Sequence, residues 1–492
     1  MTLLRERVIA VPDSSDSDRE HFVVAYGGLL ATSLALDYSV YVGGLTHLYV
    51  HDLATLSVLV GGLVLARRRG SIRPASPGIW ILLGLLAFLA LNTILVGAYE
   101  YQYVPAAMHK LYWFEHGDAI RVLGGIAVWV WAFGQLDPTS QERDLIFEFV
   151  LWGAAATIVV SAAYWLGHQV LHPETTPFDL TVMVSLPIAL AYAIRRRTRS
   201  DLIRLAIFGG GCLFLYSRSA IVIVIISTLA VLVSARNLRA VAISLGPMAA
   251  GALLVVGLTL VIPLLPGRYA PRPTVANTPP AAGTGAPVGP SASPAASSAP
   301  TPAVAAAPPA AAGPVAPGSS TNQTVKRAQQ LNTATLSDRF AIWRDAIRIF
   351  KRSPIIGVGY HDYFLYSSIT QIKDVSYLDP LDLFSSRIKQ AHNDYLSWLS
   401  EAGVIGLALY LAFWALLLTG GTMLWHREPE KRDWHAATLG FLVGLAVVSL
   451  FGELLIPRLP VWIAPTIIWW VLIAILLTDL ERRHHWPRLR LR

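Results

Sequence analysis

The chain has 492 residues, of which 54% are hydrophobic and only 14% are charged. An ordinary soluble domain carries roughly 25% charged residues, so this composition argues against a cytosolic protein. The single cysteine, Cys212, leaves no disulfide, no cysteine-ligated metal cluster and no thiol redox pair. The net charge of +8 is compatible with nucleic-acid binding, but basic residues that hold loops on the cytoplasmic side of a membrane produce the same excess.

Apolar runs long enough to cross a bilayer recur along the chain, nine before residue 265 and three after residue 403. They predict an all-α polytopic membrane protein with about 12 transmembrane helices and one large loop that contains amphipathic helices. The predicted spans cover residues 22–42, 48–66, 78–98, 118–136, 145–167, 179–194, 202–217, 219–235, 240–264, 404–424, 435–455 and 460–479.

Basic residues are concentrated in alternate loops between these spans. One set of loops holds 23 of the 39 lysines and arginines, and the positive-inside rule assigns that set to the cytoplasm. The rule predicts a cytoplasmic segment 1–21, a basic cytoplasmic tail 480–492 and a periplasmic segment between spans nine and ten. Residues 1–21 lack the pattern of a cleaved signal peptide. We therefore expect a multi-pass protein of the bacterial inner membrane, and the positions of the charges remove the nucleic-acid interpretation.

The predicted periplasmic segment has two unlike parts. Residues 265–335 include a stretch, 270–319, with 13 of the 31 prolines and little besides small residues, so we expect it to be a disordered insertion. Residues 336–403 have helical periodicity, with one helix starting near Ser337 and ending at Pro354, and a second starting near Asn393. This second part is the expected catalytic loop.

The sequence contains no nucleotide-binding loop, no paired metal-binding carboxylates and no common hydrolase motif. We interpret Gly357 and Gly359 as a turn. No metal or cofactor is expected. Because an enzyme outside the inner membrane has no nucleotide supply, it requires a pre-activated, membrane-bound donor.

Three arginines and one histidine stand where the head group of such a donor would lie. Arg218 falls between two apolar runs, where a guanidinium needs water, a partner or an anion. Arg339 opens the first loop helix, whose amino-terminal end favours an anion. Arg344 lies five positions further on, and Arg121, at the end of the fourth span, is a weaker candidate. The alternative interpretation is structural snorkelling for Arg218 and a solvated helix face for Arg339.

His392 stands just before the second loop helix, and an imidazole with an ordinary pKa near about 6.5 can accept a proton from an attacking hydroxyl. His361 is an equally good candidate on these grounds. Glu401 and Asp394 are candidates for orienting such a base. Composition alone does not choose among them.

Three motifs in this region carry a family resemblance. The stretch Ser337 to Phe364, SDRFAIWRDAIRIFKRSPIIGVGYHDYF, resembles the Arg, Trp, Pro and Gly-x-Gly segment of the O-antigen ligase and polymerase superfamily of bacterial membrane glycosyltransferases. The stretch His392 to Gly406, HNDYLSWLSEAGVIG, is similar to the ligase signature of His-Asn, nine residues and Gly-x-x-Gly. Ser217-Arg218-Ser219 resembles the Ser-Arg element, and the three motifs stand in the family's order.

The resemblance implies a metal-independent, inverting transfer of a glycan from undecaprenyl pyrophosphate to an acceptor hydroxyl at the periplasmic face. Arg218 and Arg339 would then bind the donor pyrophosphate, with Arg121 as a weaker candidate, and His392 would activate the acceptor. Asn393, Glu401 and Arg344 would support them. The 270–319 insertion departs from the family pattern.

The acceptor remains open at this point. Lipid A core, as in an O-antigen ligase, is our first choice. A polymerase of O-antigen or exopolysaccharide repeats is second, and a protein O-oligosaccharyltransferase is third. A twelve-span transporter or flippase is the alternative from another class, since Asp52, Glu148 and Glu453 lie within or near spans.

Overall fold

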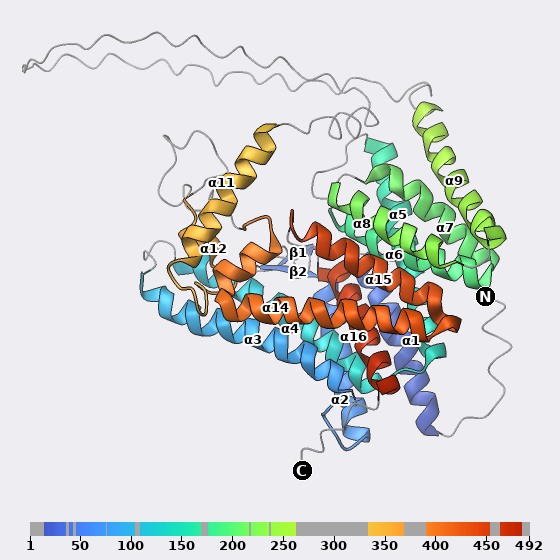
Figure 1. Ribbon diagram of the computed structural model, residues 1–492. Coiled ribbons are helices and arrows are strands. Elements are labelled where there is room, and N and C mark those ends of the chain that lie inside the picture. Colours follow the sequence, from blue (N-terminus) through green and yellow to red (C-terminus); the bar gives the residue numbers. More distant parts are fainter. Residues whose placement is uncertain are drawn as a thin grey trace, which may run out of the picture.

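The computed structural model describes residues 14–35, 39–42, 46–74, 76–103, 109–168, 176–215, 218–235, 238–261, 333–368, 390–452 and 463–484. These residues are mostly helical (Figure 1). The 270–319 insertion, Glu453 and most of the basic tail predicted at 480–492 lie outside the described residues.

The amino-terminal half consists of helices and one hairpin. Its elements are α1 (Ser14–Ala35), β1 (Ser39–Val42), β2 (Thr46–Tyr49), α2 (Val50–Arg68), α3 (Pro77–Glu100), α4 (His109–Leu136), α5 (Ser140–His168), α6 (Thr176–Arg196), α7 (Arg199–Gly211), α8 (Arg218–Ser234) and α9 (Leu238–Val261), with short 3₁₀ turns at Tyr101–Tyr103 and Cys212–Phe214.

The carboxyl-terminal half carries the predicted catalytic loop. Its elements are α11 (Thr333–Phe350), α12 (Tyr363–Tyr366), α14 (Asp394–Arg427), a 3₁₀ turn at Pro429–Lys431, α15 (Arg432–Val448) and α16 (Ile463–His484). The predicted second loop helix and the predicted tenth span are continuous as α14, which is interrupted only by non-helical dihedral angles at Gly403.

The first predicted span needs a correction. Helix α1 ends at Ala35, and the chain then forms an antiparallel hairpin in which Ser39 pairs with Tyr49 and Val42 pairs with Thr46. The sequence Ser-Val-Tyr-Val is rich in β-branched and aromatic residues, which favour a strand over a helix. Among the described residues the fold is therefore all-α apart from this hairpin, and the apolar run 22–42 is not one helix.

Seven described helices are long and apolar enough to cross a membrane, and α8 is a shorter apolar helix. They make the protein a multi-pass membrane protein, while the number of twelve spans stays a prediction. The seven lie at Val50–Arg68, Pro77–Tyr99, His116–Leu136, Ser140–Ala162, Arg239–Leu258, Asp394–Arg427 and Ala464–Arg482.

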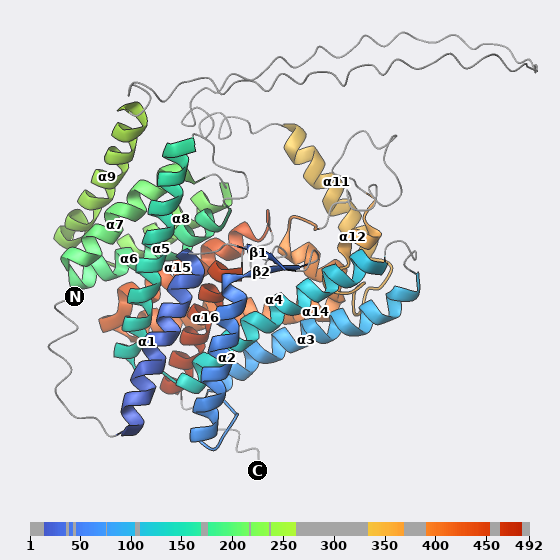
Figure 2. The same cartoon turned by 180° about the vertical axis from the view of Figure 1, so that it is seen from behind.

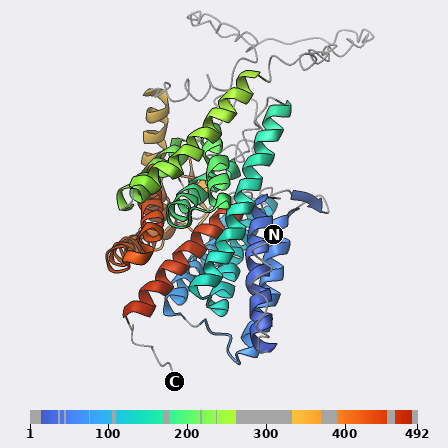
Figure 3. The same cartoon turned by 90° about the vertical axis from the view of Figure 1, so that its right-hand side faces the viewer.

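Helix α16 is the central helix of the bundle. Almost all of its apolar window is buried, including the large side chains of Trp469 and Trp470. Figure 2 shows it surrounded by the other helices. In the side view of Figure 3, α11 lies at one end of the bundle, and the first turn of α1 lies at the other. We call these the α11 end and the opposite end.

Candidate functional site

The Gly-x-Gly segment pairs with the interruption in α14. The amide groups of Val358 and Gly359 donate to the carbonyl oxygens of Ser400 (3.1 Å) and Glu401 (2.9 Å). In the reverse direction, the amide of Val404 donates to the carbonyl oxygen of Pro354 at 2.9 Å. The turn predicted at Gly357 and Gly359 is thus confirmed. The break in α14 leaves some backbone groups without a hydrogen-bond partner inside the helix, and the turn supplies those partners.

Glycine is required in this pairing for two reasons. Gly357 and Gly403 have φ angles of +73° and +67°, which L side chains rarely adopt. A Cβ atom at Gly357 would also lie 2.1 Å from the carbonyl carbon of Glu401, and one at Gly403 would lie 2.2 Å from the carbonyl oxygen of Ile355. The motif glycines therefore hold two backbone segments in direct contact.

Helix α3 fixes this pairing from the other side. The side chain of Asn92 donates to the carbonyl oxygen of Ile356 at 3.0 Å and accepts from the amide of Tyr360 at 2.7 Å. The Thr93 hydroxyl donates to the carbonyl oxygen of Tyr360 at 3.4 Å. Asn92 and Thr93 are two polar residues within an otherwise apolar span. That polar pair was the sequence signal that could have identified them as residues of the site.

The first turn of α14 is joined to the end of α15. Asn393 caps α14 by accepting the amide of Leu396 at 3.0 Å, and its side-chain amide donates to the carbonyl oxygen of Leu450 at 2.9 Å. The Asp394 amide donates to the carbonyl oxygen of Ser449 (2.8 Å), whose hydroxyl donates to the Asp394 carboxylate (2.7 Å). These contacts fix the residue just before Asn393, which is His392.

Arg339 reaches the same place from α11. Its Nη1 donates to the carbonyl oxygen of Phe451, the residue next to the one that Asn393 contacts. The Trp343 ring also lies beside the Phe451 ring, with 6.4 Å between centroids. Arg339 and Asn393, the residue that follows His392, therefore bind neighbouring carbonyl groups just after the end of α15.

The backbone of Arg218 is placed near this point by the packing of α8 on α15. Gly440 and Gly444 of α15 lie against the Cα atoms of Ser227 and Ile223 of α8, so the two helices are antiparallel and in close contact. Extending this register by five more residues directs the start of α8, at Arg218, toward Ser449, just past the end of α15. Arg339 and Asn393 thus meet at residues 450–451, and the packing of α8 directs the backbone of Arg218 toward the same place.

His392 has a left-handed backbone, with φ of +51°, and a half-buried side chain. The Gln390 amide nitrogen lies 3.0 Å from its Nδ1. His361 also has a positive φ, of +78°, and its side chain is buried. Gln390 was not among the residues predicted from the sequence, although it stands only two positions before the motif histidine.

A second buried pair near the loop was also missed. Nε2 of His116, on α4, lies 3.0 Å from the Asp362 carboxylate, and both side chains are buried. Asp362 follows His361 in the loop motif, but nothing in the sequence marks His116 as its partner. The pair links α4 to the loop that holds the Gly-x-Gly turn.

The remaining predicted residues lie around this centre. Glu401 is fully buried, and its carboxylate accepts the amide of Tyr363 at 3.1 Å, so it holds the loop after the Gly-x-Gly turn. Arg344 lies on the exposed face of α11. Arg121 lies 3.1 Å from the Asp118 carboxylate and 3.8 Å from that of Asp52, so its described ion pairs go to α4 and α2.

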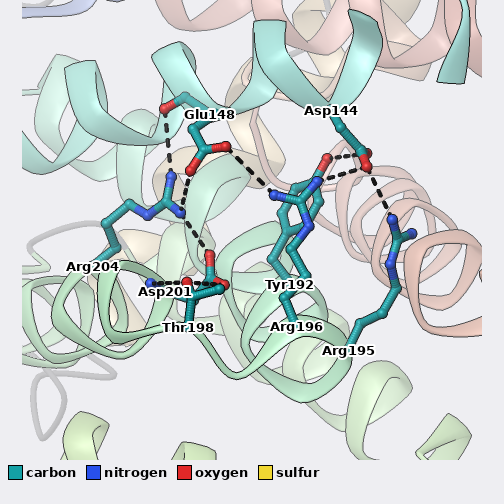
Figure 4. Close-up of polar contacts among 8 residues, drawn as sticks. All are labelled: Asp144, Glu148, Tyr192, Arg195, Arg196, Thr198, Asp201 and Arg204. Carbon is teal, nitrogen blue, oxygen red and sulfur yellow. Dashed lines mark hydrogen bonds and ion pairs between the residues drawn. The ribbon is translucent and has the colours of Figure 1, made fainter. Parts of the chain in front are cut away.

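The opposite end holds a dense network of arginines and carboxylates (Figure 4). Arg204 lies 2.6 Å from Asp201 and 3.1 Å from Glu148, while Arg196 lies 2.6 Å from Asp144. Beside the network lies a cavity of about 280 Å³, lined by residues that include Asp144 and Arg195. Within the described part of the chain, no group of three or more His, Cys, Asp or Glu side chains is placed to hold a metal ion.

Comparison with known families gives one match. Residues 203–411 match the family model of the O-antigen ligase. This range runs from α7 to the membrane helix part of α14 and includes the α8 start, α11, the Gly-x-Gly turn and His392. No curated protein matches the chain. Residues 203–411 are therefore similar to the O-antigen ligase family.

Proposed function

We propose that the protein is an inverting, metal-independent glycosyltransferase of the bacterial inner membrane. Its donor is a glycan linked to undecaprenyl pyrophosphate, and its acceptor is a hydroxyl group at the periplasmic face. In the reaction the acceptor oxygen forms a bond to the anomeric carbon, the bond from that carbon to the pyrophosphate oxygen breaks, and the hydroxyl proton passes to a base. The observation that carries the proposal is the meeting of α8, α11 and α14 around residues 449–451.

His392 is the proposed base. Asn393 and the end of α15 hold its backbone, so the imidazole is presented from a fixed point. In the structure the Gln390 amide nitrogen faces Nδ1, which places the ring proton on Nε2. Turning that amide by 180° presents its oxygen instead, moves the proton to Nδ1 and leaves Nε2 able to accept the acceptor's proton.

Arg339 and Arg218 are the proposed pyrophosphate ligands. Guanidinium groups bind phosphate oxygens through two parallel hydrogen bonds, and donors aimed at the leaving group stabilise the charge that develops there. The amino-terminal end of α8, at Arg218, adds the positive end of a helix dipole. Helix α11 begins at Thr333, six residues before Arg339, so its amino-terminal end lies more than one turn from this arginine. Arg121 stays a weaker candidate, and Asn393, Glu401 and Arg344 are proposed to support the site.

Lipid A core is the proposed acceptor, which makes the protein an O-antigen ligase. The same residues would serve a polymerase of O-antigen or exopolysaccharide repeats, or a protein O-oligosaccharyltransferase, because only the acceptor differs. A transporter is less well supported, since Glu148 pairs with Arg204 and Asp52 lies 3.8 Å from Arg121.

A deletion strain tests the proposal. Lipopolysaccharide is separated on a gel and polyprenyl-linked glycans are extracted from the same cells. For a ligase we expect lipid A core without attached glycan, together with polymerised glycan accumulating on the carrier. Single repeat units on the carrier would identify a polymerase, and unchanged lipopolysaccharide with lost protein glycosylation would identify the third activity.

A further inference from the structure

Exposed aromatic side chains mark the membrane boundaries on α3. Trp80 and Tyr99 are 49% and 60% exposed, and the helix between them is apolar. At a rise of 1.5 Å per residue, the nineteen residues that separate them span about 28 Å. This is close to the thickness of the hydrocarbon core, about 30 Å, and tryptophan and tyrosine are enriched at its two surfaces. Tyr99 therefore marks the boundary at the α11 end.

The Gly-x-Gly loop lies below that boundary. Asn92, which binds the backbone of Ile356 and Tyr360, precedes Tyr99 by seven residues and so lies about 10 Å deeper along α3. Helix α4 agrees: its exposed Trp113 stands about 5 Å above His116, and His116 contacts Asp362 in the same loop.

The loop presents apolar side chains at this depth. Ile355 and Ile356 are 65% and 50% exposed, and the exposed residues Val404 and Ile405, whose amides bond to Pro354 and Ile355, are apolar as well. Together they form one patch from three elements, which we call the loop patch: Leu91, Leu95, Ile355, Ile356, Val404 and Ile405. Four of the six belong to α3 and α14, both of which are long and apolar enough to span the membrane.

The residues that flank the patch fit a membrane surface. Lys351 and Arg352 are exposed and precede the isoleucines, with Ser353 and Pro354 between, and long basic side chains at such a position reach the head-group phosphates. The amides of residues 357–360 and the carbonyls of residues 354–356 are hydrogen-bonded, chiefly to α14 and Asn92, as a backbone that enters hydrocarbon requires.

We propose that the loop patch is inserted in the bilayer and that its partner is the hydrocarbon chains of the leaflet at the α11 end. The segment 354–360 is then a re-entrant part of the membrane domain and not an aqueous loop. This inference depends on the depth argument and not on the proposed reaction.

Site-directed spin labelling of the full chain in liposomes tests this inference. Cys212→Ala removes the one native cysteine, and Ile356→Cys then carries the nitroxide. Leu95→Cys is the reference for hydrocarbon and Lys351→Cys is the reference for the aqueous surface. Collision rates are measured with oxygen, which concentrates in hydrocarbon, and with a neutral nickel chelate, which stays in water. We expect the ratio of oxygen to nickel collisions at residue 356 to match residue 95 and exceed that at residue 351.

A nickel collision rate at residue 356 equal to that at residue 351 overturns the inference. Low collision rates with both reagents also overturn it, since they indicate that protein covers the patch. If the Ile356→Cys chain does not fold, Ile355→Cys provides the same measurement, because Ile355 is the more exposed of the two.

Discussion

The two ends of the helix bundle hold their polar groups in different ways. At the opposite end, arginine side chains meet carboxylates, as in the pairs Arg143 with Asp479 at 2.5 Å and Arg204 with Asp201 at 2.6 Å. At the α11 end, side chains of Arg339, Asn393 and Asn92 meet backbone groups at helix ends and at a helix break. The α11 end also has buried pairs, such as His116 with Asp362, but the contacts that hold its loop are made mainly to backbone groups.

This difference separates stability from chemistry. A charge that is bonded to an opposite charge is neutralised in the folded protein, so the network at the opposite end serves packing and orientation. Positive φ angles occur at both ends, but those of Gly70, Asp137 and Arg197 at the opposite end only follow the last residues of helices. At the α11 end they fall at Gly357, His361, His392 and Gly403, within the loop motifs, and such angles persist where the surrounding structure fixes them for function. Substitutions at the α11 end should therefore reduce transfer, and substitutions at the opposite end should reduce stability.

The largest effect is expected for His392→Ala. Loss of a general base reduces the rate by roughly 10²–10⁴-fold, so glycan attached to the acceptor should almost disappear from gels of a complemented deletion strain. His426→Ala is the matched control, since His426 is an exposed histidine at the far end of α14. Normal transfer by the His392 variant at equal membrane abundance would remove the catalytic assignment.

Arg204→Ala should act on stability instead. Its side chain is 1% exposed and bonds to two carboxylates, and removing one partner of a buried ion pair costs about 3–5 kcal/mol. Arg195→Ala removes a pair whose arginine is 38% exposed, for which about 0–1 kcal/mol is expected. Unfolding of the purified proteins measures both values. Reduced transfer per folded molecule in the Arg204 variant would contradict the division between the two ends.

Arg339→Ala should reduce transfer by roughly 10²–10³-fold, the effect of removing one donor that stabilises developing charge. Arg339→Lys keeps the positive charge but loses the planar pair of donors, so intermediate activity is expected. Lys351→Ala, on the same side of the molecule, is the control. Equal activity of the Lys and Ala variants would indicate that the guanidinium acts only by binding the carbonyl oxygen of Phe451.

Gly357→Ala tests the backbone pairing. The positive φ and the close approach to Glu401 predict a loss of about 1–3 kcal/mol in unfolding free energy, together with reduced transfer because the loop moves. Gly125→Ala is the control, since a Cβ atom there meets nothing within 4 Å. Unchanged unfolding of the Gly357 variant would show that the loop adapts and that the contact is not required.

The sequence predicted the helical periodicity well and the contacts between distant segments poorly. The two expected loop helices are present as α11 and the start of α14, because apolar spacing is a local signal. The cap predicted at Asn393 is confirmed, but the start predicted near Ser337 is wrong, since α11 begins four residues earlier, at Thr333. The meeting of Arg339 with Phe451, and of Asn92 with Ile356, depends on packing between segments far apart in the chain. Hydrophobic periodicity and amino-acid composition carry no information about such pairs. Only the order of the motifs along the chain indicated a common site.

The smallest and most specific effect concerns Gln390. If its amide oxygen must face Nδ1 of His392 to leave Nε2 as the base, Gln390→Glu should retain transfer, because a carboxylate can only accept the Nδ1 proton. The carboxylate also stabilises the imidazolium form, so the acid limb of the pH–rate profile should move to higher pH. Gln390→Leu, which lacks an acceptor, should lose several-fold in rate without moving that limb. A Glu variant with the wild-type profile would show that Gln390 packs against His392 without selecting its tautomer.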